Sequence, residues 1–170
     1  MKKSKIIKYF ILIAVLPAVL IWGITSVIIA SVTPPDKEKM EQHFQRDKET
    51  LTVVVDYLND LDYPFVSISK SNIKTGEMFT GAYTEYQKID DEAIVKAMKK
   101  LLNIGKYSVI GKSNNTVYFQ KWSFIQKERG IAVALNKDSR PVVEFLIKSE
   151  SLSEPGWYYY EADYEEYRKH

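Results

Sequence analysis

The chain has 170 residues, no cysteine and a formal net charge of +2. The lack of cysteine excludes a disulfide framework, a thiolate zinc site and an anchor attached through a lipid-modified cysteine. Four lysines precede residue 9, and the rest of the chain has 20 basic residues against 22 acidic ones, a balance of −2. This balance argues against a nucleic-acid partner, because nucleic-acid-binding proteins present a basic face.

Residues 9–32 form an uncharged, predominantly apolar run. A hydrocarbon core of about 30 Å is crossed by roughly 20 helical residues. We therefore predict a transmembrane helix over residues 9–32, which holds the chain in the lipid bilayer. A buried core helix is the first alternative, but core helices rarely run so far without a charge. A cleaved signal peptide is the second, but it would end in small residues, whereas Ile28 and Ile29 occupy the relevant −3 positions.

The charges that flank this run predict its orientation. Lysines are concentrated in residues 1–8, whereas residues 36–39 carry two acidic and two basic side chains. The positive-inside rule then keeps residues 1–8 in the cytoplasm as a short basic segment. Residues 33–170 are predicted to form one extracytoplasmic domain, attached to the cell membrane by a single pass.

The first element expected after the anchor is a long amphipathic helix. Thr33 is the expected cap, and Asp36 three residues later completes a pattern typical of a capping box. The run Asp62–Pro64 is expected to end the helix. The residues expected on its buried face are Met40, Phe44, Leu51, Val54, Val55, Leu58 and Leu61.

A strand, a turn, a second strand and a second helix are expected next. Alternation over 65–70 predicts the strand, 72–76 reads as a turn, and 77–86 is expected to form an irregular strand. The acidic run Asp90–Glu92 suits the start of a helix, where it complements the dipole. Gly105 is expected to end that helix in the C′ position.

Beyond Gly105 the apolar residues recur with a period of two, which is typical of strands. The resulting prediction is an α+β domain with two helices packed on one face of an antiparallel sheet of about five or six strands. The expected segments are a hairpin of 107–112 and 116–126, a turn at 128–130, strands at 130–135, 141–147 and 157–160, and a short helix at 163–169.

Sequence motifs for chemistry are few. The run Gly105–Ser113 has two glycines in the wrong spacing for a phosphate-binding loop and precedes a hairpin instead of a helix. The two histidines, His43 and His170, have no partner spacing typical of zinc, and no calcium-loop pattern is present. We therefore predict no catalytic residue, no metal and no cofactor. Paired carboxylates remain an open alternative, because 22 acidic residues are available.

An aromatic run near the carboxyl terminus has unusual composition. Side chains in the strand expected over 157–160 alternate between the two faces, so one aromatic pair is expected to complete the core. Trp and Tyr also give a binding surface a large contact area with a polar tip. The residues predicted to bind a partner are Trp157, Tyr158, Tyr160 and Tyr164.

The anchor, the capped helix and the closing pattern Gly156-Trp157-Tyr158-Tyr159-Tyr160, Asp163-Tyr164 and Arg168 resemble small membrane-anchored proteins of Gram-positive bacteria. That group has no assigned activity. The resemblance implies a bacterial origin and outward exposure of the domain, and it transfers no catalytic residue.

The function predicted from the sequence is therefore that of a membrane-anchored extracytoplasmic binding module without catalytic activity. Its expected partner is another envelope protein or a cell-wall component, in an accessory or immunity-type role. The alternative is a carboxylate-dependent hydrolase or transferase that acts on cell-envelope polymers. A deep cleft holding two acids would favour that alternative.

Overall fold

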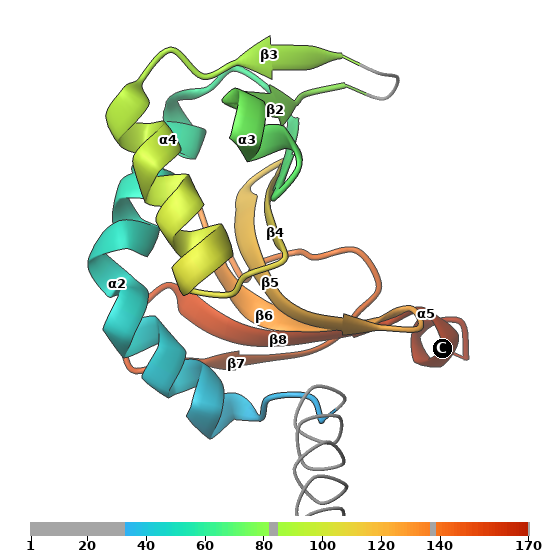
Figure 1. The fold of residues 1–170 in the computed structure, drawn as a ribbon. Helices are drawn as coiled ribbons and strands as arrows, with labels where there is room; N and C mark the ends of the chain where they lie inside the picture. Colours follow the sequence, from blue (N-terminus) through green and yellow to red (C-terminus); the bar gives the residue numbers. More distant parts are fainter. Residues whose placement is uncertain (1–32, 82–84, 137–138, 170) are drawn as a thin grey trace, which may run out of the picture. The chain divides into compact units, whose positions relative to one another are not determined.

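The computed structural model describes residues 33–81, 85–136 and 139–169. These residues form an α+β fold in which one antiparallel sheet of eight strands carries two helices on one face (Figure 1). The predicted fold class is confirmed, but the sheet has more strands than the five or six expected. None of the helices in the described ranges is both long and apolar enough to cross a membrane. The predicted anchor and basic segment, residues 1–32, lie outside these ranges.

The strands follow the order β3-β2-β1-β4-β5-β6-β8-β7 across the sheet, and each is antiparallel to its neighbours. The helices are α2 (Lys37–Asp60), α3 (Asn72–Thr75), α4 (Glu92–Lys99), its π-helical continuation η1 (Lys100–Ile104) and α5 (Tyr164–Tyr167). The strands are β1 (Phe65–Ser69), β2 (Glu77–Phe79), β3 (Tyr86–Lys88), β4 (Val109–Ser113), β5 (Thr116–Phe124), β6 (Lys127–Ala134), β7 (Leu146–Ser151) and β8 (Trp157–Asp163).

Helix α2 begins later than predicted. The cap is Asp36 and not Thr33, because the Asp36 carboxylate accepts a hydrogen bond from the Lys39 amide at 2.9 Å. Asp is as good a cap as Thr, and the later start places the two prolines before the helix. The predicted apolar face is buried, apart from Leu61 at its edge, and it also holds the carboxylate Asp47.

Helix α4 starts as predicted, with the Asp91 carboxylate accepting hydrogen bonds from the Ala93 and Ile94 amides at 2.8 and 3.2 Å. Its end differs from the prediction. Gly105 has φ −64°, which is right-handed, so it is not a C′ residue of the left-handed type. Glycine is required here because the chain passes close to the preceding helical turn: a Cβ atom on residue 105 would lie 2.6 Å from the Leu101 carbonyl oxygen.

The main core lies between the sheet and the helices α2 and α4 (Figure 1). One row of this core runs across five neighbouring strands, since each of its residues is paired in register with the next. All five side chains are buried. The row consists of Ile68, Ile110, Phe119, Ile131 and Tyr159.

The opposite face of the sheet is partly covered by the chain itself. Val143 packs there against Tyr160 and Ala162, and the Thr116 hydroxyl accepts a hydrogen bond from the Val142 amide at 2.8 Å. The prediction of a strand over 141–147 is therefore wrong. The segment crosses over the sheet, and Val143 joins a second, smaller core instead of the segment pairing in the ladder. The strand begins only at Leu146, in β7.

Two connections were also predicted incorrectly. The strand predicted over 77–86 is instead a hairpin of two short strands, β2 (Glu77–Phe79) and β3 (Tyr86–Lys88), which adds to the strand count. The β5–β6 hairpin turns at Ile125 and Gln126, and not at 128–130. Gly130 lies inside β6, where the Tyr160 ring occupies the place of a side chain. The glycine that indicated a turn is thus a packing residue.

Candidate binding surface

The four residues predicted to bind a partner do not form one surface. Trp157 is 7% exposed and packs on Phe44, with ring centroids 5.0 Å apart. Tyr160 is 0% exposed and belongs to the smaller core. Tyr158 and Tyr164 are half-buried and reach the surface. They are six residues apart along an extended strand, which separates them by about 20 Å.

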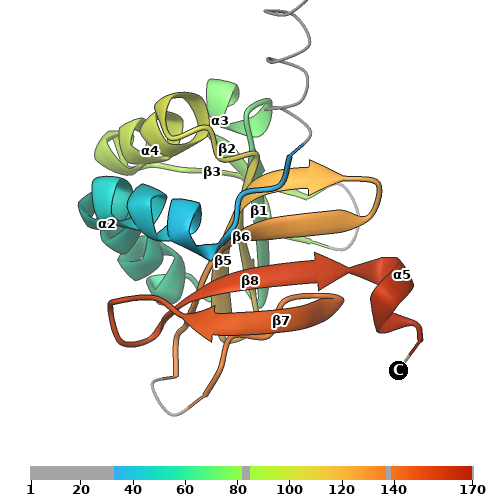
Figure 2. The ribbon, with the colours of Figure 1, turned by 90° about the horizontal axis from the view of Figure 1, so that it is seen from below.

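Tyr164 instead joins a surface that we call the aromatic end. The Tyr164 amide donates to the Gln126 carbonyl at 3.1 Å, so α5 lies against the tip of the β5–β6 hairpin. Figure 2 shows α5 continuing from the end of β8. The Phe145 ring meets the rings of Tyr164 and Tyr167 edge-on at 4.8 and 5.7 Å. The aromatic end comprises Phe124, Ile125, Phe145, Tyr164 and Tyr167.

Helix α5 is short and is held in place by its cap. The Asp163 carboxylate accepts hydrogen bonds from the Glu165 and Glu166 amides at 3.0 and 3.1 Å and pairs with Lys127 at 2.9 Å. The ion pair with Lys127 and these amides hold the pKa of Asp163 below its usual value. A short helix is thus present where one was predicted over 163–169, but it spans only Tyr164–Tyr167. The ion pair with Lys127 ties its first turn to β6.

The backbone of the aromatic end is strained. Ile125, Gln126 and Phe145 have φ values of 43°, 63° and 55°, in the left-handed region. This conformation costs an L-residue about 1–2 kcal/mol, and β-branched residues adopt it least readily. Two-residue hairpin loops of this type normally carry Asn-Gly. Ile125 is nevertheless largely exposed, so the chain keeps an apolar residue where stability favours a polar one.

A pocket of about 390 Å³ lies beside the aromatic end and is lined by two carboxylates, Glu128 and Glu144. Burial raises the pKa of Glu128, the Gln120 side chain lowers it in part, and the charge of Glu144 raises it further. Burial and the same two carboxylates raise the pKa of Tyr118 to about 12. Two carboxylates in unlike environments are the arrangement that general acid–base chemistry uses.

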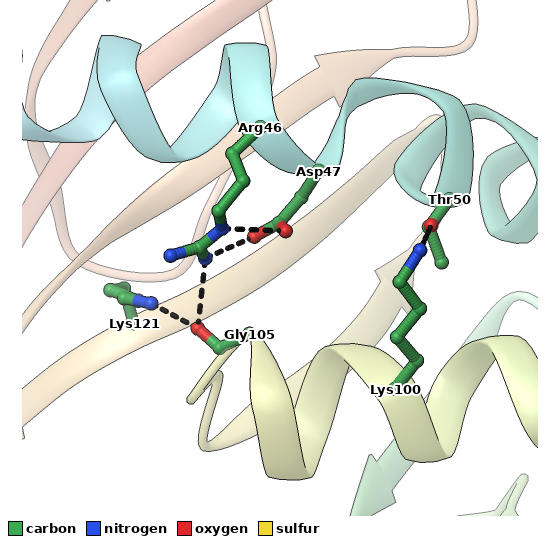
Figure 3. A network of polar contacts seen from close by, with 6 residues as sticks. All are labelled: Arg46, Asp47, Thr50, Lys100, Gly105 and Lys121. Atoms are coloured by element: carbon green, nitrogen blue, oxygen red, sulfur yellow. Dashed lines mark hydrogen bonds and ion pairs between the residues drawn. The ribbon is translucent and has the colours of Figure 1, made fainter.

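A polar network under α2 forms a second group of ionisable residues (Figure 3). The Arg46 guanidinium binds the Asp47 carboxylate through two hydrogen bonds of 2.9 and 2.5 Å. Arg46 and the Lys121 ammonium both donate to the Gly105 carbonyl. Lys121 also stands 4.6 Å from the centre of the buried Tyr107 ring. The network thus ties α2 to the end of η1 and to β5.

The charges of this network explain its ionisation states. Burial raises the pKa of Asp47, but the hydrogen bonds and charge of Arg46 outweigh this, and the net pKa is lowered. Burial and the Arg46 charge lower the pKa of Lys121 to about 8. Lys121 therefore remains largely protonated at neutral pH, and its ammonium is engaged by Gly105 and Tyr107. These contacts hold α2, η1 and β5 together, so we call Arg46, Asp47, Gly105, Tyr107 and Lys121 the structural clamp.

His43 gives the clamp a measurable dependence on pH. Burial and the charges of Lys121 and Arg46 lower the pKa of His43 to about 4, against the opposing charge of Asp47. The unfolded chain binds a proton near pH 6.5, so stability falls as the pH drops from 6.5 towards 4. We expect His43→Gln to reduce this loss by about 1 kcal/mol, since solvent screens the half-buried ring. Urea denaturation at pH 7 and pH 4.5 measures it, and equal losses in both proteins would contradict the assignment.

Among the residues that the structure describes, no group of three or more metal-ligating side chains is placed to hold an ion.

Comparisons of the chain with models of protein families, with curated proteins and with solved structures found no match. The arguments for function therefore come from the surface geometry. Of the five residues in the aromatic end, only Tyr164 was predicted to bind a partner, and Phe124, Ile125, Phe145 and Tyr167 were missed. The apolar pair Phe124-Ile125 was interpreted as part of a strand over 116–126.

Proposed function

We propose that this chain is a single-pass, membrane-anchored extracytoplasmic binding module without catalytic activity. In this proposal residues 9–32 span the cell membrane, the amino terminus is cytoplasmic, and the domain binds another envelope protein or a cell-wall component. Restriction to the membrane surface raises the effective concentration of the domain for neighbours there. Residues 1–8 supply the positive charge that sets the orientation.

The observation that carries the binding proposal is the strained and exposed aromatic end. Tyr167 is 53% exposed although Phe145 orders its ring, and Ile125 is exposed at a hairpin tip that pays a conformational cost. Aromatic side chains held in one orientation lose little entropy on binding, which makes them frequent binding hot spots. Local strain that the fold sustains is concentrated at functional sites.

Tyr167→Ala tests this proposal against a closely matched control, Tyr86→Ala. The two tyrosines are 53% and 54% exposed, and each packs its ring against one phenylalanine, Phe145 or Phe79. Tyr86 lies in the edge strand β3, far across the sheet from α5. We expect Tyr167→Ala to reduce partner capture by crosslinking in intact cells about tenfold or more. Tyr86→Ala should leave capture unchanged, and equal capture by both variants would refute the proposal.

The membrane part of the proposal has its own test. Reporter fusions at the carboxyl terminus should be active only with a reporter that works outside the cytoplasm. Replacement of the four lysines in residues 1–8 by glutamine should weaken this orientation, because the positive-inside bias is then removed. Full-length protein in the aqueous fraction of a cell lysate would contradict the anchor.

The carboxylate-lined pocket supports a second candidate, a hydrolase or transferase acting on envelope polymers. Glu128 has a raised pKa, as a general acid does, and the exposed Glu144 lines the same pocket. The pocket has about 390 Å³ and six lining residues in the described part of the chain, which is small beside the extended cleft that a polymer needs, so this candidate ranks second. If it holds, purified protein degrades cell-wall polymer, and both Glu128→Gln and Glu144→Gln abolish the degradation.

A further inference from the structure

A second apolar surface lies far from the aromatic end in the fold, between α2 and the continuous helix formed by α4 and η1. It is an open groove of about 620 Å³. In Figure 1 these helices lie side by side on the same face of the sheet. The groove is lined chiefly by Thr50, Val53, Ala93, Ala97, Asn103 and Ile104.

The π-helical turn η1 shapes one end of this groove. The widened turn leaves Ile104 73% exposed, although the neighbouring Leu101 and Leu102 are buried. On the same turn, the Lys100 ammonium crosses to α2 and donates to the Thr50 hydroxyl at 3.0 Å (Figure 3). π-Helical turns are costly relative to α-helix and occur frequently at functional sites. An exposed isoleucine on such a turn, at the end of an apolar groove, therefore indicates a binding function.

The charges around the groove are mostly of one sign. Lys96, Lys99 and Lys100 line it from α4 and η1, whereas Glu49 is the one acidic residue among the lining side chains that the structure describes. All three lysines are exposed, and Lys100 alone of them bridges to α2. An apolar floor with a basic rim complements an apolar ligand with acidic flanks.

We propose that this groove docks an amphipathic helix of a partner protein, whose apolar stripe is flanked by Asp and Glu residues. Ala93 and Ala97 lie one turn apart on α4, and their small side chains let a third helix approach closely. The open groove between two helices fits the helix-in-groove mode of recognition. This docking surface is additional to the aromatic end.

Site-specific photocrosslinking with the full chain in its own membrane tests this docking. A photoreactive amino acid replaces Val53 in the groove or, as the control, the exposed Val142 on the far side of the sheet. Crosslinks are expected from position 53 alone. The crosslinked partner peptide should contain apolar residues three and four positions apart with adjacent acidic residues.

Charge reversal provides the second readout. Lys96→Glu combined with Lys99→Glu should lower the crosslinking yield at position 53 about fivefold or more, because the acidic flanks are then repelled. Lys39→Glu combined with Lys70→Glu, at two exposed lysines outside the groove, should leave the yield unchanged. Crosslinks to lipid, to a second copy or to a segment without acidic residues would overturn the proposal, as would no crosslink. Tyr167→Ala leaves this yield unchanged, so the two binding proposals fail separately.

Discussion

Gly130→Ala is expected to destabilise the domain by about 3 kcal/mol or more. A Cβ atom at this position in β6 would lie closer than 3.0 Å to the Phe119 carbonyl oxygen and to the Tyr160 ring. The carbonyl belongs to the neighbouring strand β5 and cannot move without breaking the ladder. The Tyr160 ring is 0% exposed, so moving it aside would disturb the smaller core. The midpoint of urea denaturation, followed by tryptophan fluorescence, measures the loss.

Gly111→Ala is the matched control, because Gly111 also lies in a strand beneath a tyrosine ring. The atoms nearest to its added Cβ belong to the far end of the Tyr118 side chain and not to backbone. Tyr118 is half-buried, so its ring can tilt outwards at a smaller cost. We expect Gly111→Ala to cost less than half as much as Gly130→Ala. Equal costs would show that ring displacement, and not the Phe119 carbonyl, decides the loss.

The two long helices and the β4–β5 hairpin were predictable because their signals are local. The 3.6-residue period in α2 and the acidic cap of α4 are set within a few turns of chain, and tertiary packing agreed with both. The β4–β5 hairpin also turns where predicted, with Asn114 and Asn115 between the paired residues Ser113 and Thr116. The cap of α2 was displaced from Thr33 to Asp36, because two residues with similar capping ability lie three positions apart.

Two of the remaining errors share one physical cause, which is that both faces of the sheet are covered. The segment 141–145 has strand-like composition but packs across the far face, and Gly130 reads as a turn residue but makes room for Tyr160. Contacts between residues far apart in sequence decide both. The same covering buries Tyr160 on one face while Trp157 is buried on the other. The alternation of side chains along β8 correctly predicted that one aromatic pair faces the main core. The same pattern gives no sign of the smaller core on the opposite face of the sheet, which buries Tyr160.

The aromatic end illustrates how strain separates stability from function. Replacing Ile125 and Gln126 by Asn and Gly would suit the turn, since these residues adopt positive φ at little cost. The native pair keeps an exposed apolar side chain instead. Natural proteins keep such local conflicts at sites where selection acts on something other than stability. The conflict at this hairpin tip therefore supports the aromatic end as the binding surface, independently of the exposure of Tyr167.

Trp157→Ala is expected to cost about 3–5 kcal/mol, which identifies this aromatic residue as part of the core. The Trp157 indole lies between Phe44 on α2 and Phe119 on β5, at 5.0 and 6.3 Å, so its removal leaves a cavity where helix and sheet meet.

Tyr160→Phe gives the opposite result on the other face of the same strand. The Tyr160 hydroxyl is buried without a hydrogen-bond partner among the described residues. Its removal should therefore be neutral or stabilise the domain by about 1 kcal/mol. Thermal unfolding of both variants, together with partner capture at permissive temperature, separates core roles from binding roles in β8. If Trp157→Ala kept normal stability but lost partner capture, Trp157 would be a binding residue and not a core residue. A buried residue cannot be removed without loss of stability.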